Sequence, residues 1–280
     1  MSGQAGTSPG TSAGVPAAGG ALARTLGGFR QQARIVNALF LREMQTRFGR
    51  NQLGFLWLFI EPLMLASAIA AFKWFTDAGA HYPGVPIFVF ALVGYLPYFT
   101  FRAIVARAPG TLKSNMTLLF HSRIKLLDVV MARHALEAAA VFTVMTLIVI
   151  GVLIWGDIMP TSTAQLALGL VLLFGFSNGL GLMAAAAAAV SVFAERMIQP
   201  LVYLSLPFSG ALIALHSLDP ALREVLAWNP QANIHELVRH GFFGDLIPSY
   251  YSIGYICFWV GVLNLIGLAA LRAVRPRLEF

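Results

Sequence analysis

Residues 41–62, LREMQTRFGRNQLGFLWLFIEP, join a basic amphipathic stretch directly to a long apolar run, and this junction restricts the possible folds more than any other feature. Around it Ile35, Leu39 and Phe48 recur at roughly helical spacing among arginine and glutamine side chains. The pattern predicts a helix that lies in a membrane interface with its arginines among the lipid headgroups. The run that follows, residues 54–75, has about the 20 residues needed to cross a hydrocarbon core of about 30 Å. We therefore expect the first transmembrane helix to begin here.

Composition indicates a membrane protein. Of the 280 residues 58% are hydrophobic and 11% are charged, with a mean hydropathy of +0.74, whereas soluble domains have about 25% charged residues. No DNA- or RNA-binding motif accompanies the formal net charge of +7, so membrane lipids or an anionic substrate are the expected partners, and nucleic acid is not. The single cysteine, Cys257, excludes an intramolecular disulfide and a cysteine-rich metal site.

Hydropathy predicts an all-α integral membrane fold with six transmembrane helices. The first residues are mostly Gly, Ser, Thr, Ala and Pro, a composition that cannot bury enough apolar surface to fold. We therefore expect residues 1–28 to form a disordered tail and residues 29–280 to form the transmembrane domain. The predicted spans are residues 54–75, 85–101, 126–155, 165–193, 198–215 and 252–271.

Basic residues are distributed unequally between the two sides of these spans. Sixteen of the nineteen Lys and Arg residues flank one side, whereas the joints 76–84 and 156–164 on the other side contain aspartate but neither Lys nor Arg. The positive-inside rule makes the basic side cytoplasmic. An even number of spans then places both termini in the cytoplasm.

A short amphipathic helix is expected between the second and third spans. Its apolar residues, among them Met116 and Phe120, repeat at helical spacing opposite Lys113 and Arg123. Such a helix can dock a soluble partner at its exposed tip, or it can lie among the headgroups as a simple connector. Periodicity alone does not distinguish these two interpretations.

Residues 216–251 form an unusually long joint between the fifth and sixth spans. The segment divides at a Trp-Asn-Pro turn into two short helical patterns, 221–228 and 233–243, and Asn233 and Glu236 have the spacing of a capping box. The two helices either dip into the bilayer as a re-entrant hairpin or lie flat on the outer interface. A re-entrant hairpin would sit at the exit of a transport pathway.

No enzymatic motif is present. The sequence HELVRH, with His235 and His240, resembles the HExxH zinc signature, but a spacing of five residues turns the two imidazoles about 140° apart on a helix. We therefore expect neither a metal site nor a catalytic site here. These residues are expected to cap the helix or to lie on the surface. None of the three lysines belongs to a phosphate-binding loop. If this chain takes part in ATP-driven work, a separate subunit must hydrolyse the ATP.

Ionisable residues at membrane depth are costly and are candidates for a pathway or an ion pair. Lys73 is expected to extend to the interface, and Glu137 to pair with Arg133 one turn earlier. For Glu61, which precedes Pro62, a role in the pathway and a structural contact remain open.

Two further patterns concern the interior of the membrane domain. Tyr95 and Phe99 share a helical face with other aromatic residues, which suits sugar stacking but is more typical of helix packing. Gly175 and Gly179, followed by Gly181, form a small-residue pattern that predicts close helix packing.

Two separated blocks, LREMQTRFGRNQLGFLWLFIEPL and WNPQANIHELVRHGFF, resemble the most recognisable stretches of ABC-type polysaccharide export permeases. Specifically, they resemble the inner-membrane subunit of capsular polysaccharide exporters, and the similarity covers essentially everything from Arg34 onward. The resemblance implies a homodimer in a bacterial inner membrane, paired with two ATPase subunits that bind ATP and Mg. This chain would itself carry no cofactor. It would export a lipid-linked polysaccharide, together with a periplasmic co-polymerase or adaptor and an outer-membrane exporter.

The resemblance also implies a coupling helix over residues 115–127, which receives force from the ATPase, and a re-entrant exit over residues 217–250. The residues expected at the cytoplasmic entrance are Arg42, Arg47, Arg50, Arg107 and Lys113, and those expected along the channel are Trp57, Glu61, Tyr95 and Phe99. The residues expected in ATPase coupling are Asn115, Met116, Leu119, Phe120, Arg123 and Ile124, and those expected at the exit are Asn229, Pro230, His235, Glu236 and Arg239.

Two alternatives remain at this point. A permease for O-antigen, teichoic acid or a drug would share the fold. A stand-alone intramembrane enzyme or an ion-driven carrier would need no ATPase.

Overall fold

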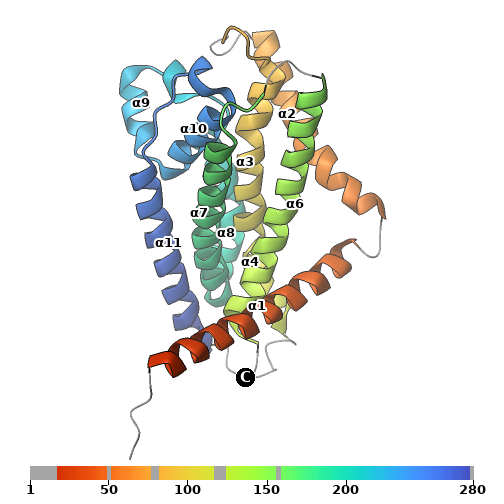
Figure 1. Ribbon diagram of the computed structural model, residues 1–280, viewed down its shortest axis with the longest axis vertical. Coiled ribbons are helices and arrows are strands. Elements are labelled where there is room, and N and C mark those ends of the chain that lie inside the picture. The colour runs from red at the N-terminus through yellow and green to blue at the C-terminus, as the bar shows by residue number, and fades with distance from the viewer. Residues whose placement is uncertain (1–17, 49–51, 77–81, 117–123, 156–158, 278–280) are drawn as a thin grey trace, which may run out of the picture.

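The computed structural model describes residues 18–48, 52–76, 82–116, 124–155 and 159–277, and these residues are helical with no strand among them. Long helices form a bundle that α1 crosses at one end, while two short helices, α9 and α10, cover the other end (Figure 1). The helices are α1 (Ala18–Phe48), α2 (Gln52–Thr76), α3 (Ile87–Arg107), α4 (Pro109–Ser114), α6 (Leu126–Trp155), α7 (Thr163–Val190), α8 (Val192–Leu204), α9 (Pro220–Ala227), α10 (Pro230–Phe243) and α11 (Ile253–Val274).

Four helices in the described ranges are long and apolar enough to cross a membrane: α3, α6, α7 and α11. They coincide with four of the six predicted spans, although α3 runs to Arg107, six residues beyond the predicted end. The predicted span at 54–75 falls on α2, whose 25 residues include Pro62.

The predicted span at 198–215 is wrong as one continuous helix. α8 has 13 residues and ends at Leu204, so it reaches only about 20 Å at 1.5 Å per residue. Pro207 lies in the 3-10 turn that follows, and Gly210 has a φ of 76°, which an L side chain rarely adopts. The chain therefore continues as turns between α8 and α9.

α7 lies at the centre of the bundle, where it packs against α11, α10 and α3. A Cβ atom on Gly179 would lie 2.8 Å from the backbone carbon of Leu263 in α11, and one on Gly175 would lie 2.7 Å from Val260 Cγ1. A Cβ atom on Gly181 would similarly meet His134 of α6. The predicted close packing through these three glycines is confirmed, because any larger residue would push neighbouring helices away.

α1 begins at Ala18, within the segment predicted to be a disordered tail. Two polar contacts join it to α6: Gln32 donates a hydrogen bond to Asp128, and Glu43 pairs with Arg133. The end of α11 lies at the same end of the bundle as α1 (Figure 1).

Candidate functional site

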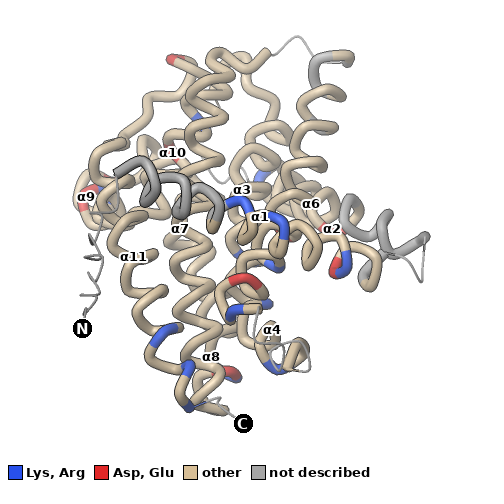
Figure 2. Tube along the Cα trace, turned by 60° about the horizontal axis from the view of Figure 1, so that its bottom comes forward, with Lys and Arg blue, Asp and Glu red and all other residues tan. Residues whose placement is uncertain are grey.

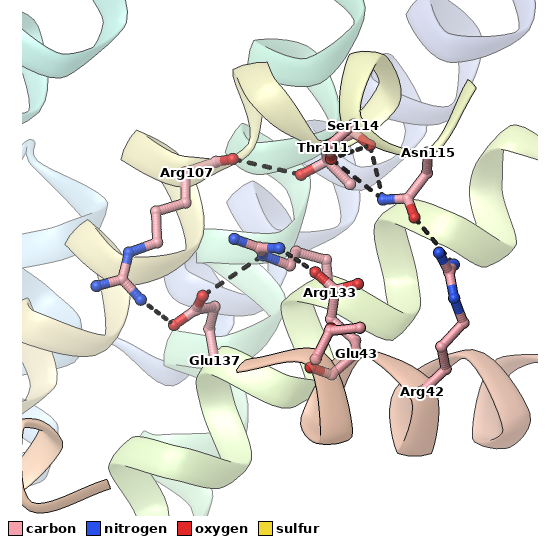
Figure 3. Close-up of polar contacts among 9 residues, drawn as sticks. Arg42, Glu43, Arg107, Thr111, Ser114, Asn115, Arg133 and Glu137 are labelled. Carbon is pink, nitrogen blue, oxygen red and sulfur yellow. Dashed lines mark hydrogen bonds and ion pairs between the residues drawn. The ribbon is translucent and has the colours of Figure 1, made fainter. Parts of the chain in front are cut away.

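Glu137 is held between two arginines where α1, α3 and α6 meet. Its carboxylate is 1% exposed and lies 2.7 Å from Arg107 Nη1 and 3.6 Å from Arg133 Nε. Arg133 in turn pairs with Glu43 of α1 (Figure 3). The predicted Glu137–Arg133 pair is confirmed, and Arg107 is an additional partner. Because the buried carboxylate has two cationic neighbours, its charge is compensated.

A second polar group surrounds Asn115 at the end of α4. Arg42 Nη1 donates to Asn115 Oδ1 at 3.3 Å, and Asn115 Nδ2 donates to the Thr111 carbonyl at 3.0 Å (Figure 3). Lys113 forms an ion pair with Glu195 of α8. These contacts connect α4 to α1 on one side and to α8 on the other.

Lys and Arg residues gather at the end of the bundle where α1, α4 and the end of α11 lie (Figure 2). Of the five residues predicted at the entrance, Arg42, Arg107 and Lys113 lie at this end and each contacts a protein partner. The side chain of Arg47 and the whole of Arg50 lie outside the described residues, as do Leu119, Phe120 and Arg123 of the predicted coupling helix. Met116 and Ile124, which flank that gap, are half-buried.

Glu61 forms an ion pair with Arg102 of α3. Arg102 Nη1 also donates a hydrogen bond of 2.9 Å to the Tyr203 hydroxyl of α8, and its guanidinium lies 4.7 Å from the centre of the Phe99 ring. Arg102 therefore joins three helices, α2, α3 and α8.

The aromatic face predicted along the channel lies inside the chain. Tyr95 and Phe99 are 3% and 1% exposed, and they pack against each other with ring centres 6.3 Å apart. The structure thus does not place them on a surface that a second subunit could share. The side chain of Trp57 is outside the described residues.

The start of α10 differs from the predicted capping box. Asn229 is the N-cap, where its side chain accepts a hydrogen bond of 2.9 Å from Gln231 N–H, and Pro230 is the first helical residue. Proline suits this position because its fixed φ fits the helix and its missing N–H would have no intrahelical partner. Asn233 and Glu236 therefore lie within the helix, and the predicted capping pair is wrong.

Asn233, Glu236 and Arg239 instead face the segments that flank α10, at intervals of three residues. Asn233 Oδ1 accepts from Ser252 N–H at 3.1 Å. Glu236 accepts from the N–H groups of Leu215 and Tyr250, each at 3.2 Å, and Arg239 Nη1 donates to it at 2.5 Å. This buried clamp, consisting of Asn233, Glu236 and Arg239, fixes α10 to both flanking segments.

His235 is buried beside this clamp, and its Nδ1 lies 2.8 Å from the Gln231 carbonyl oxygen. Burial lowers the pKa of His235 to about 4. The imidazole is therefore neutral at pH 7. The described residues contain no group of three or more His, Cys, Asp or Glu side chains that could hold a metal ion.

Comparison with known proteins identifies the family of this chain. Residues 35–243 match the ABC-2 type transporter membrane family. The chain belongs to this family. It is 34% identical to the capsule polysaccharide export inner-membrane protein CtrC of Neisseria meningitidis serogroup B, with 85% of this chain and 90% of that protein covered. Identity is 31% to the corresponding protein BexB of Haemophilus influenzae, with 89% and 94% covered, and 32% to the polysialic acid transport protein KpsM of Escherichia coli, with 88% and 95% covered.

The predicted resemblance is thus confirmed, and this chain is a membrane permease of the ABC-2 family with several helices long enough to span a membrane.

The chain of polar side chains that connects α6, α7 and α11 was not predicted from the sequence. His134 Nδ1 lies 2.7 Å from Asn178 Oδ1, and Asn178 Nδ2 donates to Asn264 Oδ1 at 2.8 Å. Asn178 and Asn264 each interrupt an apolar run, which was an available signal for interhelical hydrogen bonds.

Proposed function

We propose that this chain is the permease subunit of an ATP-driven exporter that moves lipid-anchored capsular polysaccharide across a bacterial inner membrane. The observation that carries the proposal is its similarity, over most of the chain, to three capsule or polysialic acid export proteins. Those names favour capsular polysaccharide over O-antigen, teichoic acid or a drug. Because the sequence has no phosphate-binding loop, two ATPase subunits would supply ATP hydrolysis to a permease homodimer. A periplasmic adaptor and an outer-membrane exporter would continue the route.

In this proposal the basic end of the bundle faces the cytoplasm, as the positive-inside rule expects. The ATPase docks on the segment 115–127, which begins beside α4. Asn115 contacts Arg42 of α1, and Lys113 of α4 pairs with Glu195 of α8. A displacement of this segment by the ATPase would therefore be transmitted to α1 and α8 through these contacts.

An acidic glycan would approach the entrance cluster Arg42, Arg47, Arg50, Arg107 and Lys113 by electrostatic attraction. Glu137 and Glu195 already compensate two of these cations, so the arginines of α1 and the net charge of +7 contribute most of the attraction. The glycan would then pass between subunits along the α2 surface that carries Trp57 and Glu61. Contact with Tyr95 and Phe99 would require the packed helices to separate, because both rings are buried.

At the opposite end, α9 and α10 form a re-entrant exit. Twelve of the fourteen residues of α10 are buried, which favours a helix inserted among the spans over a helix lying flat on the interface. Asn229 and Pro230 start this helix, and the buried clamp holds it in place.

The experiment that tests this proposal is purification of the full chain from its capsule-forming host. We expect an ATPase subunit to co-purify and mass spectrometry to detect a lipid-linked glycan. Ile124→Asp should leave insertion intact but uncouple ATP hydrolysis from export, because a charge replaces an apolar contact in the coupling segment. Normal surface capsule with Ile124→Asp would remove the coupling assignment, and a purified chain without an ATPase would remove the proposed function.

A further inference from the structure

An open cavity of about 680 Å³ lies between α1 and the bundle, walled by α6, α7 and α11. Protein interiors contain few voids larger than a water molecule, so an opening of this size is unusual. The volume falls within the range of about 300–1,000 Å³ that is usual for small-molecule sites. The apolar residues that shape it include Ala33, Phe40, Met131, Ala135, Leu182 and Leu268.

In the part of the chain that the structure describes, four of the five polar side chains in the cavity wall, all except that of Asn37, form hydrogen bonds with protein groups. Asn178 donates to Asn264 at 2.8 Å, and Asn264 donates to the Gly175 carbonyl at 2.8 Å. Gln32 donates to Asp128, whose carboxylate also accepts the Lys125 N–H at 3.0 Å. Gln32, Asp128, Asn178 and Asn264 therefore keep their hydrogen bonds when an apolar molecule occupies the cavity.

Two arginines flank the cavity on the helices that line it. On α11, Arg272 follows the lining residue Leu268 by four residues, so it lies one turn farther along the same face. On α1, Arg30 precedes the lining residue Ala33 by three residues and lies on the same stripe. Both arginines are exposed, and among the residues that the structure describes neither has an ion-pair partner. Arg272 lies in the last turn of α11, which ends at the same end of the bundle as α1 (Figure 1).

An apolar cavity with free cations at its edge, beside helices that cross a bilayer, matches the chemistry of one kind of ligand. We propose that the cavity binds an acyl chain of an anionic bilayer phospholipid, with the phosphate group held by Arg30 and Arg272. The chain would lie under α1 against Met131, Ala135 and Leu268. The lipid would therefore fill the space between α1 and the bundle and help to hold α1 in place. This site is separate from the proposed glycan pathway, which runs along α2.

Photolabelling of the purified full-length protein tests the site. The probe is phosphatidylglycerol with a diazirine near the end of one acyl chain, in phosphatidylcholine vesicles that contain no capsule glycolipid. We expect cross-links on peptides that contain Met131–Ala135 and Asn264–Leu268. Ala135→Phe should lower this labelling by about tenfold, because the ring occupies space that several buried methylene groups would fill. Ala139→Phe, one turn farther along α6 and exposed, should label as the unmodified protein does.

A second variant keeps the test valid if Ala135→Phe fails to fold. Arg272→Gln leaves the cavity unchanged and should reduce the preference for phosphatidylglycerol over phosphatidylcholine carrying the same diazirine chain. Labelling that is spread evenly over the outer surfaces of the helices would overturn the proposal. It would also be overturned by equal labelling in folded Ala135→Phe, or by a headgroup preference that Arg272→Gln does not change. None of these results would affect the proposed export function, which depends on the ATPase and the glycan.

Discussion

Arg239 donates a hydrogen bond of 2.7 Å to the backbone carbonyl of Gly210, which joins α10 to the turns that follow α8. The same guanidinium pairs with Glu236, and both side chains are at most 1% exposed. α10 therefore carries a complete ion pair inside the protein. A buried pair contributes little net stability when intact, but removal of one partner leaves an uncompensated charge.

Replacement of Arg239 by Met is expected to destabilise the protein by about 3–5 kcal/mol, because Glu236 would lose its cation while remaining buried. The measurement is thermal unfolding of the purified protein in detergent. Arg275→Met, at an exposed position after α11, is the matched control and should have a much smaller effect. Equal melting temperatures for Arg239→Met and the unmodified protein would show that the buried pair is absent in solution.

Substitution of Gly179 tests the contact between α7 and α11. Gly179→Ala should destabilise the protein by about 1–3 kcal/mol, because the added methyl group would lie 2.8 Å from the Leu263 backbone. Gly261→Ala in α11 is the control, since no atom lies within 4 Å of the Cβ position, and it should be neutral or stabilising by up to about 1 kcal/mol. Thermal unfolding in detergent would measure both changes. A tolerated alanine at Gly179 would contradict the close approach of these helices.

Exchange of the two charges in the Glu61–Arg102 ion pair tests whether Glu61 has a structural role or a role in the transport pathway. Glu61→Arg and Arg102→Glu should each reduce the amount of inserted protein, because each places two like charges together at membrane depth. The double exchange should restore insertion, since it rebuilds the pair in reverse. Immunoblots of membranes and surface capsule measured together separate the outcomes. Restored insertion without restored capsule would assign Glu61 a role in the pathway beyond its structural contact.

Acid should destabilise the protein through His235. Its pKa is about 4 in the folded protein and about 6.5 in the unfolded chain, so the unfolded chain binds more protons as the pH falls below 6.5. The contribution of neutral His235 is present above that value and is lost toward pH 4, with a loss of about 2 kcal/mol at pH 5. The melting temperature should therefore fall less between pH 7 and pH 5 in His235→Leu than in the unmodified protein. Identical pH profiles would contradict burial of this imidazole.

Neutralisation of the two arginines at positions 47 and 50 tests the entrance. Arg47→Gln combined with Arg50→Gln should lower export about 2- to 10-fold, because the acidic glycan would be attracted less strongly. Arg107→Gln would be a poor test, since it leaves Glu137 partly uncompensated. The double variant Arg275→Gln and Arg277→Gln removes the same charge from the exposed end of the chain and is the control. If the double variant at Arg47 and Arg50 is inserted and bound to the ATPase but surface capsule is unchanged, the entrance assignment is wrong.

The parts of the fold that follow from local patterns could be predicted from the sequence. The bounds of α6 and the glycine packing of α7 both follow from apolar length and small-residue spacing. The interruption after α8 was not predicted, because residues 198–215 are mostly apolar and hydropathy outweighed the effect of Pro207 and Gly210. The burial of Tyr95 and Phe99 depends on which helices surround α3, which periodicity does not specify.

The clamp on α10 has a consequence for how related sequences can diverge. Asn233, Glu236 and Arg239 bind main-chain atoms at Leu215, Tyr250, Ser252 and Gly210, and every amino acid except proline supplies an amide hydrogen. At the first three positions, which donate these N–H groups, the clamp itself therefore requires only a residue other than proline. Within the clamp, selection would act on the side chains of Asn233, Glu236 and Arg239. A comparison across distant relatives should therefore find these three residues invariant while neighbouring residues vary.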